Sequence, residues 1–216
     1  LITKNGISGL GDCHIPEFAT LSGNYDEADP GEYENMMLKE IYDQPSSLSN
    51  ALSGRIGADG VSTSLGGLAL SPHEILQLDR INLVACGTAY FAAEIISSFI
   101  RDLTDIQAEA FIASEFPSHS VCSSNTLTIG ISQSGETKDT LDALQKAKLH
   151  GSNISSICNV IGSTISRITG NGAYLHAGPE YAVASTKVVS NMIISFALLA
   201  LSLSEKTNQN TDQQLQ

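Results

Sequence analysis

The stretch ISQSGETKDT, residues 131–140, places several hydroxyl side chains directly after a short apolar run. Ser132, Ser134 and Thr137 supply hydroxyl donors, and Gly135 lets the backbone turn closely around a bound group. A helical pattern follows, so the free N–H groups and the positive dipole end of that helix would face the same spot. This combination suits a phosphate dianion, although a single loop of this kind is better explained as a helix cap.

Two further junctions between an expected strand and an expected helix carry small hydroxyl residues. They are ACGTAY at 85–90 and AVASTK at 182–187. In an open parallel α/β sheet, ligands bind beyond the carboxyl ends of the strands. Three hydroxyl loops at one predicted edge therefore favour ligand binding over simple capping.

Other catalytic signatures are incomplete. No lysine follows Gly135 directly, as Walker A requires, and SQSGE lacks the G-x-S-x-G pattern of a serine hydrolase. Cys86 could act as a nucleophile, but a small hydrophobic residue at a strand end is the more usual reading. Lys187 could aid an anion or form a Schiff base, or it could be a solvated lysine at a helix start. Glu136 and Glu180 could carry protons or simply lie near helix starts.

Composition narrows the class of protein. A chain of 216 residues with 42% hydrophobic and 16% charged residues is globular, and it is one domain or a domain with tails. The net charge of −12 argues against non-specific binding to nucleic acid or to an anionic membrane. The four cysteines form no C-x-x-C pair, and Cys13 beside His14 has no second pair of ligands nearby. We therefore expect free thiols in a reducing compartment and no metal site.

Strands and helices alternate from residue 81 onward. Strands are expected at 81–85, 106–111, 126–132, 154–160 and 173–177. Helices are expected at 90–103, 137–151 and 186–204, with a short helical turn after GST (162–164). This alternation predicts a three-layer αβα sandwich on a mostly parallel, Rossmann-like (flavodoxin-like) sheet.

The flanking segments have weaker patterns. Residues 1–31 read as a leader or interdomain connection, and 32–45 and 46–56 as helices separated near Pro45, followed by a loop at 57–67. The domain is predicted to span 32–205, and 206–216 is a polar tail without a core pattern.

The apolar run 188–203 raises the question of a membrane span. It carries Ser190, Asn191 and Ser195 and is shorter than the roughly 20 residues that a bilayer needs, which favours a helix buried in a soluble core. Because the sequence begins at Leu1 without a signal-peptide pattern, we expect a fragment of a longer cytoplasmic chain.

The SQSGET loop resembles the signature of the sugar isomerase (SIS) domain family. Wider similarity over residues 36–190 points to the glucosamine-6-phosphate synthase family within it. The motifs that carry it are KEIYDQP (39–45), ACGTAY (85–90), ASEF (113–116), SQSGETKDTL (132–141), ICNVIGSTISR (157–167) and AGPEYAVASTK (177–187). Those synthases join a glutaminase domain to an isomerase half of two SIS domains, and transfer ammonia from glutamine to fructose 6-phosphate.

The resemblance implies that this chain is the linker and first SIS domain, with the glutaminase domain and second SIS domain outside it. Its partners would be those two domains, a sugar phosphate and a second copy of the parent chain. The family's catalytic glutamate, lysine, histidine and glutaminase cysteine have no counterparts here, so the resemblance assigns no catalytic residue, and it implies no cofactor. The alternative is a stand-alone SIS domain that senses or isomerises a sugar phosphate.

The resemblance also assigns substrate-binding positions. The SQSGET residues would hold the phosphate, the ACGT residues would line the same pocket, and the VAS residues would face the sugar. The full set is Cys86, Gly87, Thr88, Ser132, Gln133, Ser134, Gly135, Thr137, Val183, Ala184 and Ser185. Two departures from the family pattern stand out: Ala89 replaces a serine that helps to hold the phosphate, and Tyr181 and Ala182 replace isoleucine and glycine.

Overall fold

A computed structural model describes residues 2–3, 6–7, 29–60, 62–68 and 70–214. Within the expected leader, the short strands β1 (Ile2–Thr3) and β2 (Gly6–Ile7) pair in antiparallel fashion. The rest of that leader up to residue 28, with Cys13 and His14, lies outside the described residues.

Five parallel strands form the central sheet, and all five were predicted. They are β3 (Arg80–Ala85), β4 (Gln107–Ile112), β5 (Thr126–Ser132), β6 (Asn153–Cys158) and β7 (Gly172–Tyr174). Their spatial order is β4-β3-β5-β6-β7, with every pairing parallel. The strand order therefore reverses between β3 and β5, and sheets of this order bind ligands in the crevice at that reversal.

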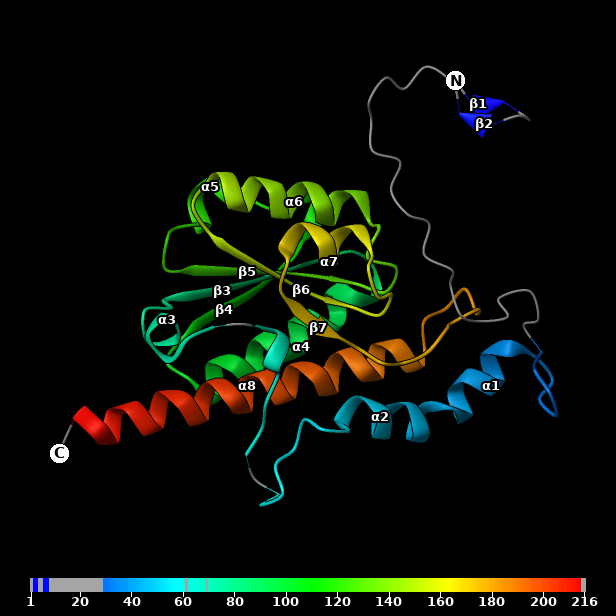
Figure 1. Ribbon diagram of the computed structural model, residues 1–216, viewed down its shortest axis with the longest axis horizontal. Helices are drawn as coiled ribbons and strands as arrows, with labels where there is room; N and C mark the ends of the chain where they lie inside the picture. The colour runs from blue at the N-terminus through cyan, green and yellow to red at the C-terminus, as the bar shows by residue number, and fades with distance from the viewer. Residues whose placement is uncertain (1, 4–5, 8–28, 61, 69, 215–216) are drawn as a thin grey trace.

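Helices cover both faces of the sheet, as the predicted three-layer αβα sandwich requires (Figure 1). α4 (Thr88–Leu103) and α8 (Lys187–Gln214) lie on one face. α5 (Ser118–Val121), α6 (Lys138–Leu149) and α7 (Thr164–Thr169) lie on the other. Along β3, Ile81 and Leu83 belong to the core beneath α4 and α8, whereas Val84 belongs to the core beneath α6. This alternation buries both faces of the sheet.

The apolar helix α8 is a core helix of this fold. Its segment Lys187–Lys206 is long and apolar enough to cross a membrane, yet more than half of that segment is buried inside the protein. Its polar residues meet the N-terminal helices α1 (Met36–Tyr42) and α2 (Gln44–Leu52). Ser47 Oγ donates to Asn191 Oδ1 (3.0 Å), and Arg55 Nη1 donates to Ser195 Oγ (3.2 Å). Polar positions in the apolar run thus attach α2 and the segment that follows it.

Several boundaries differ from the prediction. Within the described residues, six short elements were missed: β1, β2, η1 (Gly66–Leu68), α3 (Pro72–Leu76), η2 (Ala113–Glu115) and α5. α8 continues to Gln214 rather than ending near 204, so residues 206–214 extend a helix instead of forming a separate tail. Adding residues to an existing helix needs no new nucleation, and Glu, Lys and Gln are good helix formers. The predicted break near Pro45 is confirmed, because Pro45 lies in the first turn of α2.

Candidate functional site

A pocket of about 180 Å³ lies at the carboxyl ends of β3 and β5, where the strand order reverses. All three hydroxyl junctions contribute to its wall, as predicted from their places in the sequence. Its lining residues are Cys86, Thr88, Ala89, Ile131, Ser132, Gln133, Ser134, Thr137, Ser185 and Met192. None of these side chains is charged, so any anion held here would rely on neutral donors and helix dipoles.

The hydroxyls of the loop after β5 form a small network. Ser132 Oγ and Thr137 Oγ1 lie 2.9 Å apart, so one of the two hydroxyls donates to the other, and Ser132 Oγ also accepts from the Gly135 N–H (3.0 Å). Ser134 Oγ accepts from the Glu136 N–H (3.2 Å). One hydroxyl proton of the Ser132–Thr137 pair and the proton of Ser134 therefore stay available to a ligand.

The helices that start at this edge differ in whether a carboxylate accepts hydrogen bonds from their first N–H groups. Glu136 Oε1 accepts from the Thr164 N–H (2.8 Å) at the start of α7, and Glu180 Oε1 accepts from the Thr186 N–H (2.8 Å) before α8. The cap residues of α4, α6 and α7, which are Gly87, Thr137 and Ser163, make no side-chain cap hydrogen bond themselves, and of these three helices α7 has Glu136 in place of a cap. In the first turn of α4 the Tyr90 N–H already donates to Gly87 O (3.1 Å). The other N–H groups in the first turns of α4 and α6 remain available, next to the pocket.

The loop before α8 contributes Ser185 to the pocket wall. Its hydroxyl donates to Glu180 Oε2 (2.9 Å), so Ser185 offers an acceptor oxygen to the pocket rather than a proton. Val183 and Ala184 are exposed and do not line the pocket. The three predicted residues of this loop are therefore neighbours of the site, but only Ser185 belongs to its wall.

A family model described as the SIS domain matches residues 74–202. The chain belongs to the SIS domain family. The curated "Glutamine--fructose-6-phosphate aminotransferase [isomerizing]" of Clostridium acetobutylicum is 36% identical over 220 residues, covering 100% of this chain and 36% of the relative. The protein of the same name from Thermus thermophilus is 42% identical over 175 residues, covering 81% of this chain and 28% of the relative.

A solved structure is also similar to this SIS chain. The C-terminal domain of glucosamine-fructose-6-phosphate aminotransferase from Francisella tularensis matches with a TM-score of 0.74 and 35% identity, over 85% of this chain and 51% of that one. The predicted fold and the predicted family resemblance are confirmed by these similarities. The SIS chain spans about a third of the length of the curated relatives.

Two glycines shape the SIS pocket without lining it. Gly87, the cap residue of α4, has a φ of 59°, and Gly135 has a φ of 67°. A Cβ on Gly135 would lie 2.0 Å from Ser163 Oγ. Gly135 is therefore required both by its left-handed backbone and by the side chain behind it. Its close approach is to Ser163, not to the pocket interior.

Lys187 is not the solvated lysine that one interpretation of the sequence suggested. It is 7% exposed, and its Nζ lies 3.5 Å from Asp43 Oδ2. Asp43 also accepts from Lys39 Nζ (2.9 Å), and this hydrogen bond, with the charge of both lysines, lowers the pKa of the Asp43 carboxyl. The amine of Lys187 therefore joins α8 to the KEIYDQP segment.

The three cysteines of the described ranges are free thiols, and those ranges contain no cluster of His, Cys, Asp and Glu that could hold a metal. Burial raises the pKa of Cys158 to about 11 and also raises that of Cys122. Both thiols are therefore protonated at neutral pH, which makes them poor nucleophiles. Cys86 lies in the pocket wall and also packs against the core beneath α6.

Three pocket residues were not among the predicted site residues: Ala89, Ile131 and Met192. Ala89 was noted only as a departure from the family pattern, and Ile131 reads as part of a buried strand. Met192 comes from α8 and is 2% exposed. No local signal marks Met192, because its place in the wall depends on how α8 crosses the sheet.

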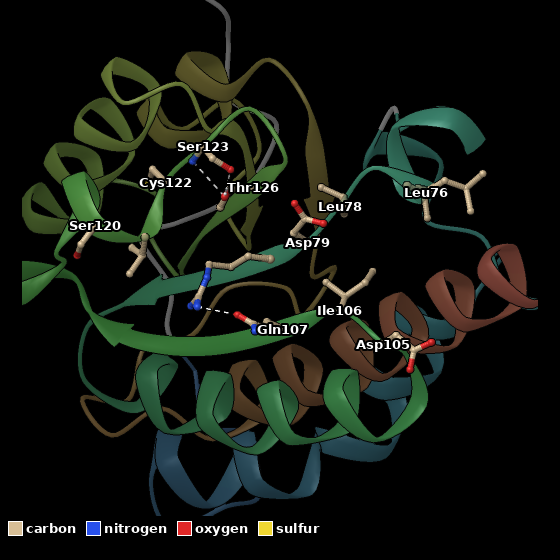
Figure 2. Close-up of a pocket in the computed structure, with 13 residues that line it drawn as sticks. Leu76, Leu78, Asp79, Asp105, Ile106, Gln107, Ser120, Cys122, Ser123 and Thr126 are labelled. Carbon is tan, nitrogen blue, oxygen red and sulfur yellow. Dashed lines mark hydrogen bonds between the residues drawn. The ribbon is translucent and has the colours of Figure 1, made fainter.

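A larger cavity, of about 640 Å³, lies at the opposite edge of the sheet. Figure 2 shows Asp79, Asp105 and Gln107 around it, near the amino ends of the strands. The Arg80 guanidinium, which also lines it, already bonds to Gln107 Oε1 (2.8 Å) and Glu109 Oε2 (3.0 Å). The cation that lines this cavity, Arg80, is therefore already hydrogen-bonded to other protein groups.

Proposed function

We propose that this chain is the fructose 6-phosphate-binding first SIS domain of a glucosamine-6-phosphate synthase, that is, of a glutamine–fructose-6-phosphate aminotransferase (isomerizing) like the curated relatives. The domain would span residues 32–205. Residues 1–31 would be a leader or linker, and the polar residues 206–216 would follow the domain. One observation carries the proposal. Unpaired hydroxyl protons and two helix starts without side-chain caps meet in one uncharged pocket where the strand order reverses.

The phosphate would occupy the side of the pocket between the starts of α4 and α6. Ser134 and Thr88 would donate hydroxyl protons, and the Ser132–Thr137 pair would donate one more. Backbone N–H groups at the helix starts favour an anion through their partial positive charge. Gln133 lies in the same wall and would supply an amide, whereas Gly87 and Gly135 would set the turns.

The sugar would extend toward the loop before α8. Ser185 offers an acceptor there, which suits a sugar hydroxyl and not a phosphate oxygen. Val183 and Ala184 would face the sugar where it leaves the pocket, and Cys86 would pack against it. A pocket of 180 Å³ is smaller than the roughly 300–1,000 Å³ that encloses a drug-sized ligand, so the sugar would remain partly open to other domains.

The complete reaction would need the rest of the parent enzyme. In the proposed parent, a glutaminase domain releases ammonia from glutamine and a second SIS domain supplies the groups that move protons on the sugar. We assign no catalytic residue and no cofactor to this chain, so it would show no turnover by itself. The parent would be a cytoplasmic homodimer whose product feeds amino-sugar synthesis.

Binding can be tested by titrating the isotope-labelled chain with fructose 6-phosphate. Amide signals of residues 132–138 and of Thr88 should shift, whereas unphosphorylated fructose should leave them unchanged. Shifts confined to the opposite edge of the sheet, or equal shifts with both sugars, would contradict the proposal. Turnover of fructose 6-phosphate by the chain alone would instead favour a stand-alone isomerase. A DNA-binding helix-turn-helix in the parent reading frame would favour a sugar-phosphate sensor.

A further inference from the structure

Glu40 of the KEIYDQP segment is a buried acid whose hydrogen bonds run to a distant loop. Its side chain belongs to α1, and the residue is 1% exposed. Glu40 Oε1 accepts from the backbone N–H of Tyr181 (2.5 Å) and from that of Ala182 (3.2 Å). Hydrogen bonds to a buried carboxylate are among the strong ones in proteins, so this contact fixes the start of the loop before α8.

A second carboxylate holds the other end of the same loop. Glu180 accepts from the Ser185 hydroxyl (2.9 Å) and from the Thr186 N–H (2.8 Å). Between these two attachments the chain bulges outward, with Val183 and Ala184 exposed. The loop 181–185 is thus an arch fixed at both ends, and its last residue, Ser185, lines the pocket.

The helix that carries Glu40 is itself tied to the rest of the domain. One turn later, Asp43 contacts Lys187 at the first position of α8 (3.5 Å). Ser47 of α2 donates its hydroxyl to Asn191 Oδ1 of α8 (3.0 Å), and Asn191 Nδ2 donates to the Ser47 carbonyl (3.1 Å). Both hydrogen bonds are buried. Glu40 therefore projects from a support that is fixed to α8, and the arch is held against the same helix.

We infer that Glu40 is a positioning residue for the ligand: it holds the arch so that Ser185 stays in the pocket wall. This inference rests on the proposed function, because it concerns the sugar end of the proposed sugar-phosphate site. The phosphate end depends on α4 and α6, which Glu40 does not touch. Glu40 therefore selects for the sugar part of the ligand, and the N-terminal helices belong to the binding site through it.

The same contact is compatible with the unusual residues Tyr181 and Ala182. Glu40 bonds their backbone N–H groups, so this contact does not depend on which side chains these positions carry. Within the described residues, His176 is the one non-glycine residue with a positive φ. Ala182 therefore adopts a backbone conformation that needs no glycine.

The test compares three variants of this chain. E40A removes the acceptor, E40Q keeps one acceptor oxygen without the charge, and E34A removes an exposed acid just before α1 as a matched control. Hydrogen exchange at the Tyr181 and Ala182 amides reports the arch. Calorimetry with fructose 6-phosphate and with inorganic phosphate separates the sugar end of the site from the phosphate end.

We expect E40A to lose protection of both amides and to bind fructose 6-phosphate about tenfold more weakly, because the loosened arch must be ordered on binding. Inorganic phosphate should bind within about twofold of the unchanged protein, since its contacts lie at α4 and α6. E40Q should recover most of the lost affinity, and E34A should match the unchanged chain in every measurement.

Two outcomes overturn the inference. Equal losses for both ligands would mean that Glu40 acts through general stability, and unchanged exchange with unchanged affinity would mean that it positions nothing. If the unchanged chain binds neither ligand, the proposed function fails. The exchange rates of E40A then decide independently whether Glu40 holds the arch.

Discussion

The two edges of the sheet each carry a cavity, and the smaller one has the features of a binding site. At the amino edge, a cavity of about 640 Å³ is lined by Arg80, whose guanidinium already bonds to Gln107 in the wall and to Glu109 outside it. At the carboxyl edge, a pocket of about 180 Å³ has no charged lining residue but holds hydroxyl protons without partners. We therefore base the proposed site on hydroxyl donors without partners and not on cavity volume.

The parallel topology causes this difference. Every helix that follows a strand begins at the carboxyl edge and ends at the amino edge, so N–H groups gather at one edge and carbonyls at the other. At the carboxyl edge, the acids Glu136 and Glu180 already occupy the starts of α7 and α8. The starts of α4 and α6 have no such acid, which is why we propose them for the phosphate.

The largest expected effect is a loss of affinity for fructose 6-phosphate when hydroxyl groups are removed from the carboxyl-edge pocket and not from the amino-edge cavity. Replacing both Ser134 and Thr88 by alanine removes two of the proposed hydroxyl donors to a charged group, which are typically worth about 1.5–3 kcal/mol each. We expect fructose 6-phosphate to bind at least 100-fold more weakly, as measured by calorimetry. The matched control replaces Ser120 and Ser123, two exposed serines of the amino-edge cavity, and should leave the affinity unchanged.

Two other results would contradict the placement of the site in the carboxyl-edge pocket. A large loss from the amino-edge pair would move the site to the larger cavity. Equal losses from both pairs would indicate that hydroxyl removal acts through stability, which the urea midpoints of the two double variants would reveal.

The sequence predicted the pocket because its residues follow strand ends directly. SQSGET and ACGTAY each carry a local signal, and parallel strands bring their carboxyl ends to one edge. Glu40, Lys187 and Met192 could not be placed in this way. Their contacts join residues far apart in the chain, such as Glu40 with Tyr181, and nothing in the local pattern of α1 specifies that partner. The helix α3 is different, because its capping box of Ser71 and Glu74 is a local sequence signal that predicts a helix start.

A smaller effect concerns stability: the ion pairs of Asp43 should contribute more to the free energy of unfolding than the ion pair of Glu109 does. At the carboxyl side, Asp43 meets the buried Lys187 and also Lys39, whereas at the amino edge Glu109 is largely exposed beside Arg80. We expect Asp43→Asn to reduce the free energy of unfolding by about 1–2 kcal/mol at pH 7, and Glu109→Gln by a few tenths. Urea unfolding of each variant measures both.

The lowered pKa of Asp43 determines how its contribution to the free energy of unfolding changes with pH. Hydrogen bonding from Lys39 lowers the pKa of Asp43 below its ordinary value of 3.8. The stabilisation is therefore complete above about pH 4 and is lost as the pH falls through the lowered pKa. The gap between the unchanged chain and Asp43→Asn should narrow below pH 4. A gap that stays constant down to pH 2.5 would show that Asp43 acts through packing and not through its charge.

The smallest expected effect concerns Ala89 at the start of α4. Ala89 lines the pocket, and the cap residue of α4 makes no side-chain cap hydrogen bond, so a hydroxyl at this position would add a donor where the phosphate is expected. Water can fill the space beside alanine and bridge nearly as well as a direct bond, which limits the gain from Ala89→Ser. We expect fructose 6-phosphate to bind about threefold more tightly, or somewhat under 1 kcal/mol, and unphosphorylated fructose to gain nothing. An equal gain for both sugars in calorimetry would place residue 89 beside the sugar ring. No gain for either sugar would mean that α4 contributes to the phosphate site through its backbone N–H groups and Thr88 alone.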